Sequence, residues 1–270
     1  MFGLSEPELQ AIVRMECPYS QRMIDTGKNG RVKMRNVEEP RGALRPIHER
    51  VSALLSRIET PEFLFCPVKG RSYVDNAKVH VKSAHIRTLD VKSYFPSTPL
   101  RRVYWFFNAI MECSTDVAVM LARLLTVEGH LATGSTVSPI LSFYAFYDMW
   151  LAISEIAKAA GCRISVYMDD LTVSGLAVPE RIFWEIKKQI SSRGLEYHKE
   201  RNFICGTAEV TGVLLRDGKA LVPNRQLRKA HLIRTQIRQT EDQDHVVELT
   251  SRLMGLNSQR AQIELPRART

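Results

Sequence analysis

The chain has 270 residues, 44% of them apolar, so it is long enough to bury a sizeable core in one large domain or a few closely packed subdomains. Its net charge of +9 comes from Lys and Arg residues spread along the chain, which favours a nucleic-acid backbone over a small anionic metabolite as partner. The first residues lack the pattern of a signal peptide and no apolar run approaches membrane-spanning length, so we expect a cytoplasmic protein that contacts no membrane.

Three elements are predicted near the start of the chain. Ser5-Glu6-Pro7-Glu8 has the spacing of a capping box with Pro inside the first turn, which predicts a short helix. Basic and apolar residues alternate on either side of Asn29-Gly30, which predicts a hairpin within 28–37. Its charges suit either phosphate binding or a solvated edge strand. Apolar residues at helical spacing from Leu44 to Ile58 predict a core helix.

The next predicted strand ends beside an acid. Ile86 to Val91 resembles a strand, and Phe95-Pro96-Ser97 stops regular structure soon after it, so we expect Asp90 near the C-terminal end of that strand. Two helices are predicted over about 100–111 and 116–128. A long buried helix is then predicted as far as Ala160, with Ser138 as its cap and Pro139 in its first position.

An acidic pair lies between two predicted strands. In Val166-Tyr167-Met168-Asp169-Asp170-Leu171-Thr172-Val173, strand-favouring residues flank the pair, which predicts a tight hairpin that presents two carboxylates. Neighbouring carboxylates repel each other, and a fold that places them beside further acids usually relies on a bound divalent cation. Magnesium is the natural candidate, and a solvated surface turn is the alternative.

The elements predicted after the acidic pair complete a known order of strands and helices. A helix is predicted from Pro179 to Gly194, a strand within 195–205, and half of a hairpin at 210–215. From Ile86 to Phe203 the order is strand, helices, strand, strand, helix, strand, which is the split βαβ, ferredoxin-like order. In this topology Asp90 and the pair Asp169-Asp170 lie on adjacent central strands, so the three carboxylates can converge.

Two helices are predicted at the end of the chain, and the first carries two stripes. Its apolar stripe consists of Leu227, Ala230, Ile233 and Ile237, and its basic stripe of Arg228, His231, Arg234 and Arg238. The basic stripe suits either a solvated face or a helix laid along a duplex. The core residues predicted for the second helix are Val246, Val247, Leu249 and Leu253.

Three segments together resemble the catalytic motifs of a reverse transcriptase. They are Asp90 to Ser97, Thr133-Gly134 through Ser138-Pro139, and Tyr167-Met168-Asp169-Asp170. The resemblance covers most of the chain and implies an RNA-directed DNA polymerase. It also implies an α+β right-hand polymerase fold, with fingers over 1–85 and part of 99–135, a ferredoxin-like palm over 86–215 and a short helical thumb over 216–270.

Two shorter blocks resemble those of retron-type bacterial reverse transcriptases. Asn76-Ala77-Lys78-Val79-His80 matches an Asn-Ala-x-x-His block, and Val210-Thr211-Gly212 matches a Val-Thr-Gly block. The resemblance implies that both blocks position a structured noncoding RNA, which serves as template and primer and is copied into multicopy single-stranded DNA. It also implies antiphage defence beside a separate effector protein. The structural alternative makes Asn76 a turn residue, His80 a core imidazole and Val-Thr-Gly a strand end.

The resemblance further implies roles for individual residues. Two magnesium ions are expected on Asp90 and Asp169, with Asp170 in support and the backbone carbonyl of Val91 completing the coordination. Phe95 matches the position whose ring lies beneath the sugar of the incoming dNTP and excludes a 2′-hydroxyl by bulk. Lys33 and Arg35 in the fingers hairpin are candidates for the triphosphate.

The chain departs from the family pattern in two places. Many relatives carry Pro-Gln-Gly where this chain has Ala132-Thr133-Gly134, so a glutamine contact to the nucleotide cannot be carried over to these candidate nucleotide-binding residues. The lysine of the fourth motif aligns best with Arg201, and Lys199 is close by. Because a guanidinium stays protonated, Arg201 suits stabilisation of pyrophosphate charge and is a poor proton donor.

Other functions stay open at this point. One is a group II intron-like or stand-alone defence reverse transcriptase with a general template, and a cognate RNA on purification would separate it from a retron enzyme. Another is a noncatalytic RNA-binding scaffold derived from the same fold. The presence of all three acids argues against the scaffold.

Overall fold

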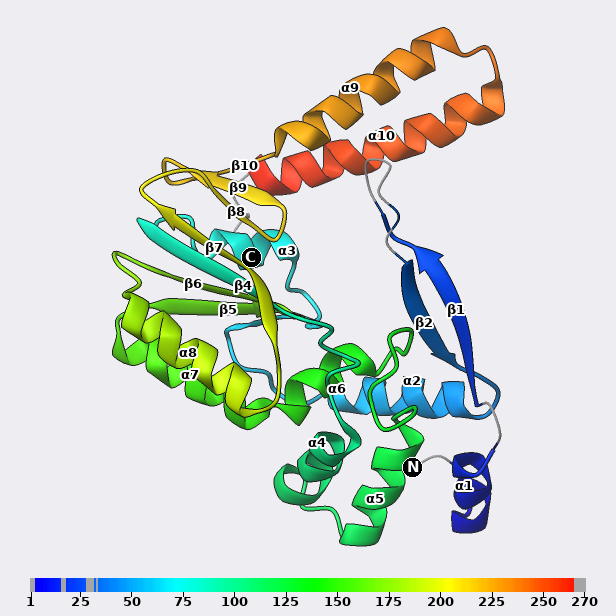
Figure 1. The fold of residues 1–270 in the computed structure, drawn as a ribbon. Helices are drawn as coiled ribbons and strands as arrows, with labels where there is room; N and C mark the ends of the chain where they lie inside the picture. The colour runs from blue at the N-terminus through cyan, green and yellow to red at the C-terminus, as the bar shows by residue number, and fades with distance from the viewer. Residues whose placement is uncertain (1–2, 16–17, 28–31, 33, 265–270) are drawn as a thin grey trace.

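The computed structural model describes residues 3–15, 18–27, 32 and 34–264. Figure 1 shows three groups of elements: a central sheet with helices beneath it, a set of helices from which a two-stranded hairpin projects, and a long helical hairpin at the far end. We keep the names palm, fingers and thumb for these groups. The predicted boundaries at 85/86 and 215/216 each fall inside a strand.

The central sheet of the palm has five strands. They are β3 (Leu64–Cys66), β4 (His85–Val91), β5 (Arg163–Tyr167), β6 (Asp170–Gly175) and β7 (Tyr197–Ile204). Their order across the sheet is β3-β5-β6-β4-β7, and β4 pairs antiparallel with both β6 and β7. The predicted order of strands and helices is therefore confirmed, and the strand that carries Asp90 is the neighbour of the strand that begins at Asp170.

Helices cover both faces of this sheet. On one face lie α7 (Tyr147–Ala159) and α8 (Glu180–Ser192), and α8 buries Phe183, Ile186 and Ile190, which recur at helical spacing. On the other face the short helix α3 (Tyr73–Lys78) packs against β3 and β5. Val74 and Ala77 of α3 join Ile86 of β4 in a second apolar cluster, separate from the main core.

The long buried helix predicted from Ser138 is wrong in two respects. It is divided into α6 (Ser138–Ala145) and α7, which are bent by 66°. Phe146 lies at the bend with φ −118° and ψ 30°, outside the helical region, and its buried ring stacks on Tyr94 at 6.1 Å between centroids. Ser138 is the first helical residue instead of the cap, because its hydroxyl donates to the carbonyl of Ala132 at 2.6 Å.

Among the described residues, no single helix has the length and apolar composition needed to cross a membrane. The bent pair α6 and α7 meets that criterion only when the two are taken together, by length and composition alone.

The fingers combine helices with one hairpin. The helices are α1 (Glu6–Val13), α2 (Leu44–Leu55), α4 (Leu100–Trp105), the π-helix η1 (Phe106–Ile110) and α5 (Thr115–Leu124). Strands β1 (Tyr19–Asp25) and β2 (Met34–Pro40) pair antiparallel along their whole length and project from the helices in Figure 1. The predicted hairpin is present, but it begins earlier than expected, and Asn29-Gly30 lies outside the described residues.

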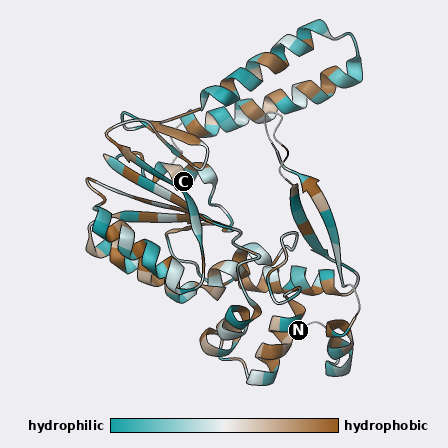
Figure 2. Cartoon of the chain, viewed as in Figure 1, coloured by the Kyte–Doolittle hydropathy of each residue, from teal (hydrophilic) through white to brown (hydrophobic). Residues whose placement is uncertain are grey.

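A small sheet joins the palm to the thumb. It consists of β8 (Ala208–Val210), β9 (Val213–Arg216) and β10 (Lys219–Leu221), and the thumb helices α9 (Asn224–Gln239) and α10 (Gln243–Glu264) follow it. Figure 2 shows that these two helices are mostly hydrophilic, with scattered apolar residues. Val247, predicted as core, is 68% exposed, whereas Leu249 is buried. The prediction for Val247 is wrong because α10 buries only a narrow stripe.

Candidate active site

The three aspartates come together at one end of the central sheet. Asp90 of β4 lies directly opposite Asp170, the first residue of β6. Asp169 belongs to the turn between β5 and β6, and its backbone carbonyl accepts a hydrogen bond from the Val91 N–H at 2.8 Å. Adjacent central strands therefore bring these residues to one place, as expected from the strand order.

The turn that carries the acidic pair is strained. Tyr167 pairs with Asp170, which leaves Met168 and Asp169 as the two turn residues. Met168 has a φ of 56°, in the left-handed region that side chains other than glycine rarely adopt. Two-residue hairpins favour turns with positive φ, so the strain follows from a turn tight enough to place neighbouring carboxylates beside Asp90.

Burial and repulsion from neighbouring carboxylates raise the pKa values of Asp169 and Asp170. Burial and then repulsion from Asp169 and Asp90 raise the pKa of Asp170 to about 6, against the opposing charges of Lys199 and Arg201. Burial and Asp90 also raise the pKa of Asp169, which Lys199 and Arg35 oppose. The site therefore disfavours the charged form of Asp169 and Asp170, which is the condition that a bound cation relieves.

Basic residues of β7 contact Asp90. Lys199 Nζ lies 2.6 Å from Asp90 Oδ2, and His198 Nδ1 lies 3.3 Å from Asp90 Oδ1. The pairing of β4 with β7 shifts register between Thr88 and Asp90, and Lys199 has a φ of 54°. Such an irregularity changes the direction in which a side chain points, and here it directs the Lys199 side chain toward the acids. Sequence reasoning missed His198, because the shift cannot be inferred from strand pattern.

The donor set fits magnesium. Within the described part of the chain, no group of three or more His, Cys, Asp and Glu side chains is arranged to hold a metal ion. Magnesium, however, takes few protein ligands, prefers carboxylate and carbonyl oxygens and keeps several waters. The oxygens of Asp90, Asp169, Asp170 and Val91 suit this ion. The binding of two magnesium ions stays a prediction.

A groove of about 350 Å³ opens beside the acids. Its walls include Asp90, Asp170, Lys199, Arg201, Thr211, Gly212 and Arg225. Thr211 and Gly212 form the turn between β8 and β9, and both have positive φ, of 44° and 83°. Val210 is buried in the second apolar cluster, so the prediction that it contacts RNA is wrong.

The side chains of Asn76 and His80 are also buried, which corrects the prediction that they contact RNA. The ring nitrogens of His80 each lie 2.7 Å from a serine hydroxyl, Ser174 on β6 and Ser165 on β5. Burial lowers the pKa of His80 to about 3, so the ring is neutral. Asn76 Nδ2 donates to Thr211 Oγ1 at 3.3 Å. The block thus joins α3 to the palm sheet and to the groove wall.

The residues expected around the incoming nucleotide differ in their exposure and in their contacts with the protein. Phe95 is half-buried, with its ring 6.2 Å from that of Tyr94. Arg35 is exposed on β2, and its charge acts on the pKa of Asp169. Lys33 lies outside the described residues. The Thr133 hydroxyl bonds to the backbone of β2, which leaves it unsuited to the predicted contact with the nucleotide.

The basic stripe of the thumb is exposed. Arg228, Arg234 and Arg238 all lie on α9, and Arg234 donates to Asn257 Oδ1 of α10 at 3.2 Å. In Figure 1 the thumb helices extend from the small sheet toward the side on which the fingers hairpin lies. Binding of RNA by this stripe stays a prediction.

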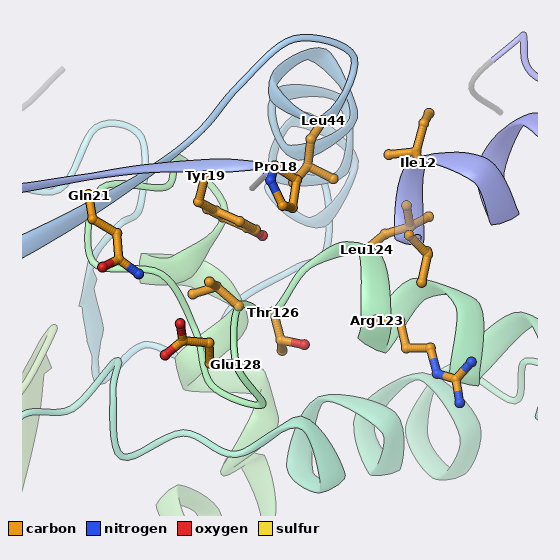
Figure 3. A pocket seen from close by; sticks show the side chains of 11 residues that line it. Ile12, Pro18, Tyr19, Gln21, Leu44, Arg123, Leu124, Thr126 and Glu128 are labelled. Carbon is orange, nitrogen blue, oxygen red and sulfur yellow. The ribbon is translucent and has the colours of Figure 1, made fainter. Parts of the chain in front are cut away.

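A larger cavity, of about 570 Å³, lies in the fingers. Figure 3 shows it between α1, β1 and the segment after α5, with Tyr19, Arg123 and Glu128 among its lining residues. None of the predicted site residues lines it. The smaller groove beside the acids is therefore the candidate active site.

The curated relatives of this chain share one description. The retron Se72 reverse transcriptase of Salmonella heidelberg is 28% identical over 176 residues, which are 64% of this chain and 46% of that protein. The retron Mx65 reverse transcriptase of Myxococcus xanthus is 25% identical over 80% of this chain and 56% of its own length. The retron Ec86 reverse transcriptase of Escherichia coli is 24% identical over 74% of this chain and 65% of its own length.

This chain resembles retron reverse transcriptases. The resemblance predicted from its motifs is thus confirmed, although the chain spans only 46% to 65% of the length of these relatives. No protein-family model matches it. Among solved structures, telomerase from Candida albicans, determined with a fragment of telomeric RNA, gives a TM-score of 0.55 over 93% of this chain and 56% of that chain, at 10% identity. This likeness confirms the α+β right-hand polymerase fold.

Proposed function

We propose that this chain is an RNA-directed DNA polymerase of the retron type. The observation that carries the proposal is the meeting of Asp90 with Asp169 and Asp170 on adjacent strands, in a chain whose curated relatives are retron reverse transcriptases. The raised pKa values of both turn aspartates support a site that is completed by cations.

The residues of the groove divide the work of phosphoryl transfer. Asp90 and Asp169, with Asp170 and the Val91 carbonyl, would hold two magnesium ions, which supply activation of the primer hydroxyl and neutralisation of the triphosphate. Lys199 and Arg201 line the same groove as the acids and suit the charge of the departing pyrophosphate. Arg35 on the fingers hairpin would bind the triphosphate, and Phe95 would exclude a 2′-hydroxyl.

The partners follow from the retron type. A structured noncoding RNA would serve as template and primer, dNTPs as substrates, and a branched RNA–DNA as product, in the cytoplasm. Thr211 and Gly212 in the groove wall and the exposed arginines of α9 are the surfaces that suit this RNA. A role in antiphage defence would need a separate effector chain.

Primer extension tests the polymerase activity. The purified chain is expected to extend a DNA primer on an RNA template with magnesium and to stop when EDTA removes the metal. An Asp90→Asn variant serves as the inactive control. Lack of any extension by a folded wild-type chain that binds RNA would support the noncatalytic scaffold instead.

Sequencing of the copurified nucleic acid tests the retron type. One defined structured RNA, covalently joined to single-stranded DNA, is the expected result. Unrelated RNA fragments without attached DNA would favour the group II intron-like or stand-alone alternative with a general template.

A further inference from the structure

The segment between α5 and α6 holds the fingers hairpin through Thr133. The Thr133 hydroxyl donates to the Asn36 carbonyl at 2.9 Å and accepts from the Glu38 N–H at 3.1 Å. The next residue extends the contact, because the Gly134 N–H donates to the Glu38 carbonyl at 3.0 Å. Thr133 and Gly134 thus bond to β2 much as a short neighbouring strand would.

The fit between this segment and β2 is close. A Cβ atom on Gly134 would lie 2.6 Å from Glu39 Cγ and 2.9 Å from the Glu38 carbonyl oxygen, so glycine is required there. A second contact lies beside it, where His130 Nε2 is 3.2 Å from both carboxylate oxygens of the buried Glu38. The hairpin is therefore fastened to the rest of the protein at Asn36 and Glu38.

The fastened part of the hairpin adjoins Arg35, the residue expected to bind the triphosphate. Arg35 immediately precedes Asn36 on β2, and its charge opposes the rise in the pKa of Asp169. The hairpin projects from the fingers in Figure 1, so the position of Arg35 relative to the acids depends on how β2 is held. Thr133 makes its bonds one and three residues beyond Arg35.

We propose that Thr133 is a positioning residue for dNTP binding, which acts by holding in place the strand that carries Arg35. The inference rests on the proposed polymerase function. The hydroxyl of threonine is short and is used as both donor and acceptor by the backbone of β2, so it does not reach the nucleotide itself. Loss of the bonds would lower the fraction of molecules with the hairpin in its binding position, which weakens apparent affinity by the same factor.

Steady-state kinetics with three variants tests the role. Thr133→Val keeps the shape and removes both bonds, and it should raise the KM for dNTP about threefold to tenfold with kcat within about twofold. Thr133→Ser keeps the hydroxyl and should restore the wild-type KM. Thr136→Val, at an exposed position in the same segment, is the matched control and should leave KM unchanged.

A double-mutant cycle separates positioning from direct contact. In an Arg35→Ala background, Thr133→Val should have no further effect on the KM for dNTP, because the residue acts through Arg35. Full additivity of the two changes, or an unchanged KM in the single variant, would overturn the inference.

Amide hydrogen exchange supplies a measurement that is independent of activity. Exchange in the β2 segment 34–40 should speed up in Thr133→Val and not in Thr133→Ser or Thr136→Val. Unchanged exchange would overturn the inference even if the wild-type chain proves to be no polymerase. A wild-type chain without polymerase activity but with faster exchange in Thr133→Val would instead refute the proposed function and leave the fastening of β2 established.

Discussion

The two ends of the β5–β6 hairpin carry polar clusters of opposite character. Asp170, Thr172 and Ser174 alternate along β6 and therefore share one face of the sheet. At one end Ser174 and Ser165 satisfy both ring nitrogens of His80. At the other end the turn is strained at Met168 and the aspartates repel one another. A fully satisfied buried network stabilises a fold, whereas an unneutralised cluster on a strained turn indicates chemistry.

The difference between the two ends corrects the interpretation of the retron-like block that contains Asn76 and His80. Asn76 and His80 lie on the same side of the sheet as the acids, and their buried side chains bond to Thr211 and Ser174 of the protein. An effect of Asn76 on RNA would be indirect, through Thr211 in the groove wall. The following predictions test this division between a structural end and a chemical end.

The largest expected effect on stability follows from His80→Ala. The change leaves a cavity and two buried serine hydroxyls without their partner, so we expect a loss of about 3–5 kcal/mol in the free energy of unfolding. Activity per folded molecule at low temperature should persist, because the acids are untouched. Urea unfolding measures the loss, with the exposed His231→Ala as control. A loss below about 1 kcal/mol would contradict a structural role for His80.

Acid should destabilise the protein through the same residue. The folded-state pKa of His80 is lowered to about 3, below its usual value near 6.5. Between these values the unfolded chain binds a proton that the folded chain does not, so stability is intact above pH 6.5 and falls as the pH drops toward 3. The contribution approaches about 1.4 kcal/mol per pH unit. In His80→Gln, the pH dependence measured by urea unfolding should be weaker by about one proton; an identical dependence would show that the imidazole is already protonated in the fold.

Phe95→Val should change sugar selectivity without changing stability greatly. The smaller side chain opens space for a 2′-hydroxyl, so the preference for dNTP over NTP should fall about tenfold or more. Competitive single-nucleotide extension measures the ratio. An unchanged ratio would mean that the half-buried ring of Phe95 only packs against its neighbours.

The smallest effect is expected in the thumb. Arg234→Ala combined with Arg238→Ala should reduce the slope of log affinity for RNA against log salt by about one unit per lost phosphate contact. Filter binding at several salt concentrations measures the slope. Arg45→Ala on α2, which removes an exposed arginine paired with Glu49, is the control. Equal slopes in wild type and double variant would leave the stripe a solvated face.

The order of elements from Ile86 to Phe203 could be predicted because each element has a local sequence pattern, whereas the edge strand β3 was not predicted. The composition of runs such as Ile86 to Val91 predicts strands, and the ferredoxin-like order of elements then predicts that Asp90 lies beside Asp170, as the structure shows. The position of the acids is thus a consequence of topology.

The rest of the site depends on contacts between residues far apart in the sequence. The register shift that aims Lys199 at Asp90 is a property of two paired strands, and local pattern does not encode it. Thr133 and Asn36 are 97 residues apart in the sequence, so the hydrogen bond between the Thr133 hydroxyl and β2 could not be inferred. The burial of His80 was open as an alternative, because a histidine next to apolar residues suits a core as well as a surface.

The most direct test of the chemical end of the hairpin is a paired measurement on Asp169→Asn. The amide keeps the shape and removes one of the repelling charges, so primer extension with magnesium should fall by about a thousandfold or more. Thermal stability without metal should stay equal or rise, since burial and Asp90 disfavour the charge at Asp169. Affinity for RNA should stay nearly unchanged. A variant that extends primers at a substantial fraction of the wild-type rate would contradict the assignment of these aspartates to catalysis.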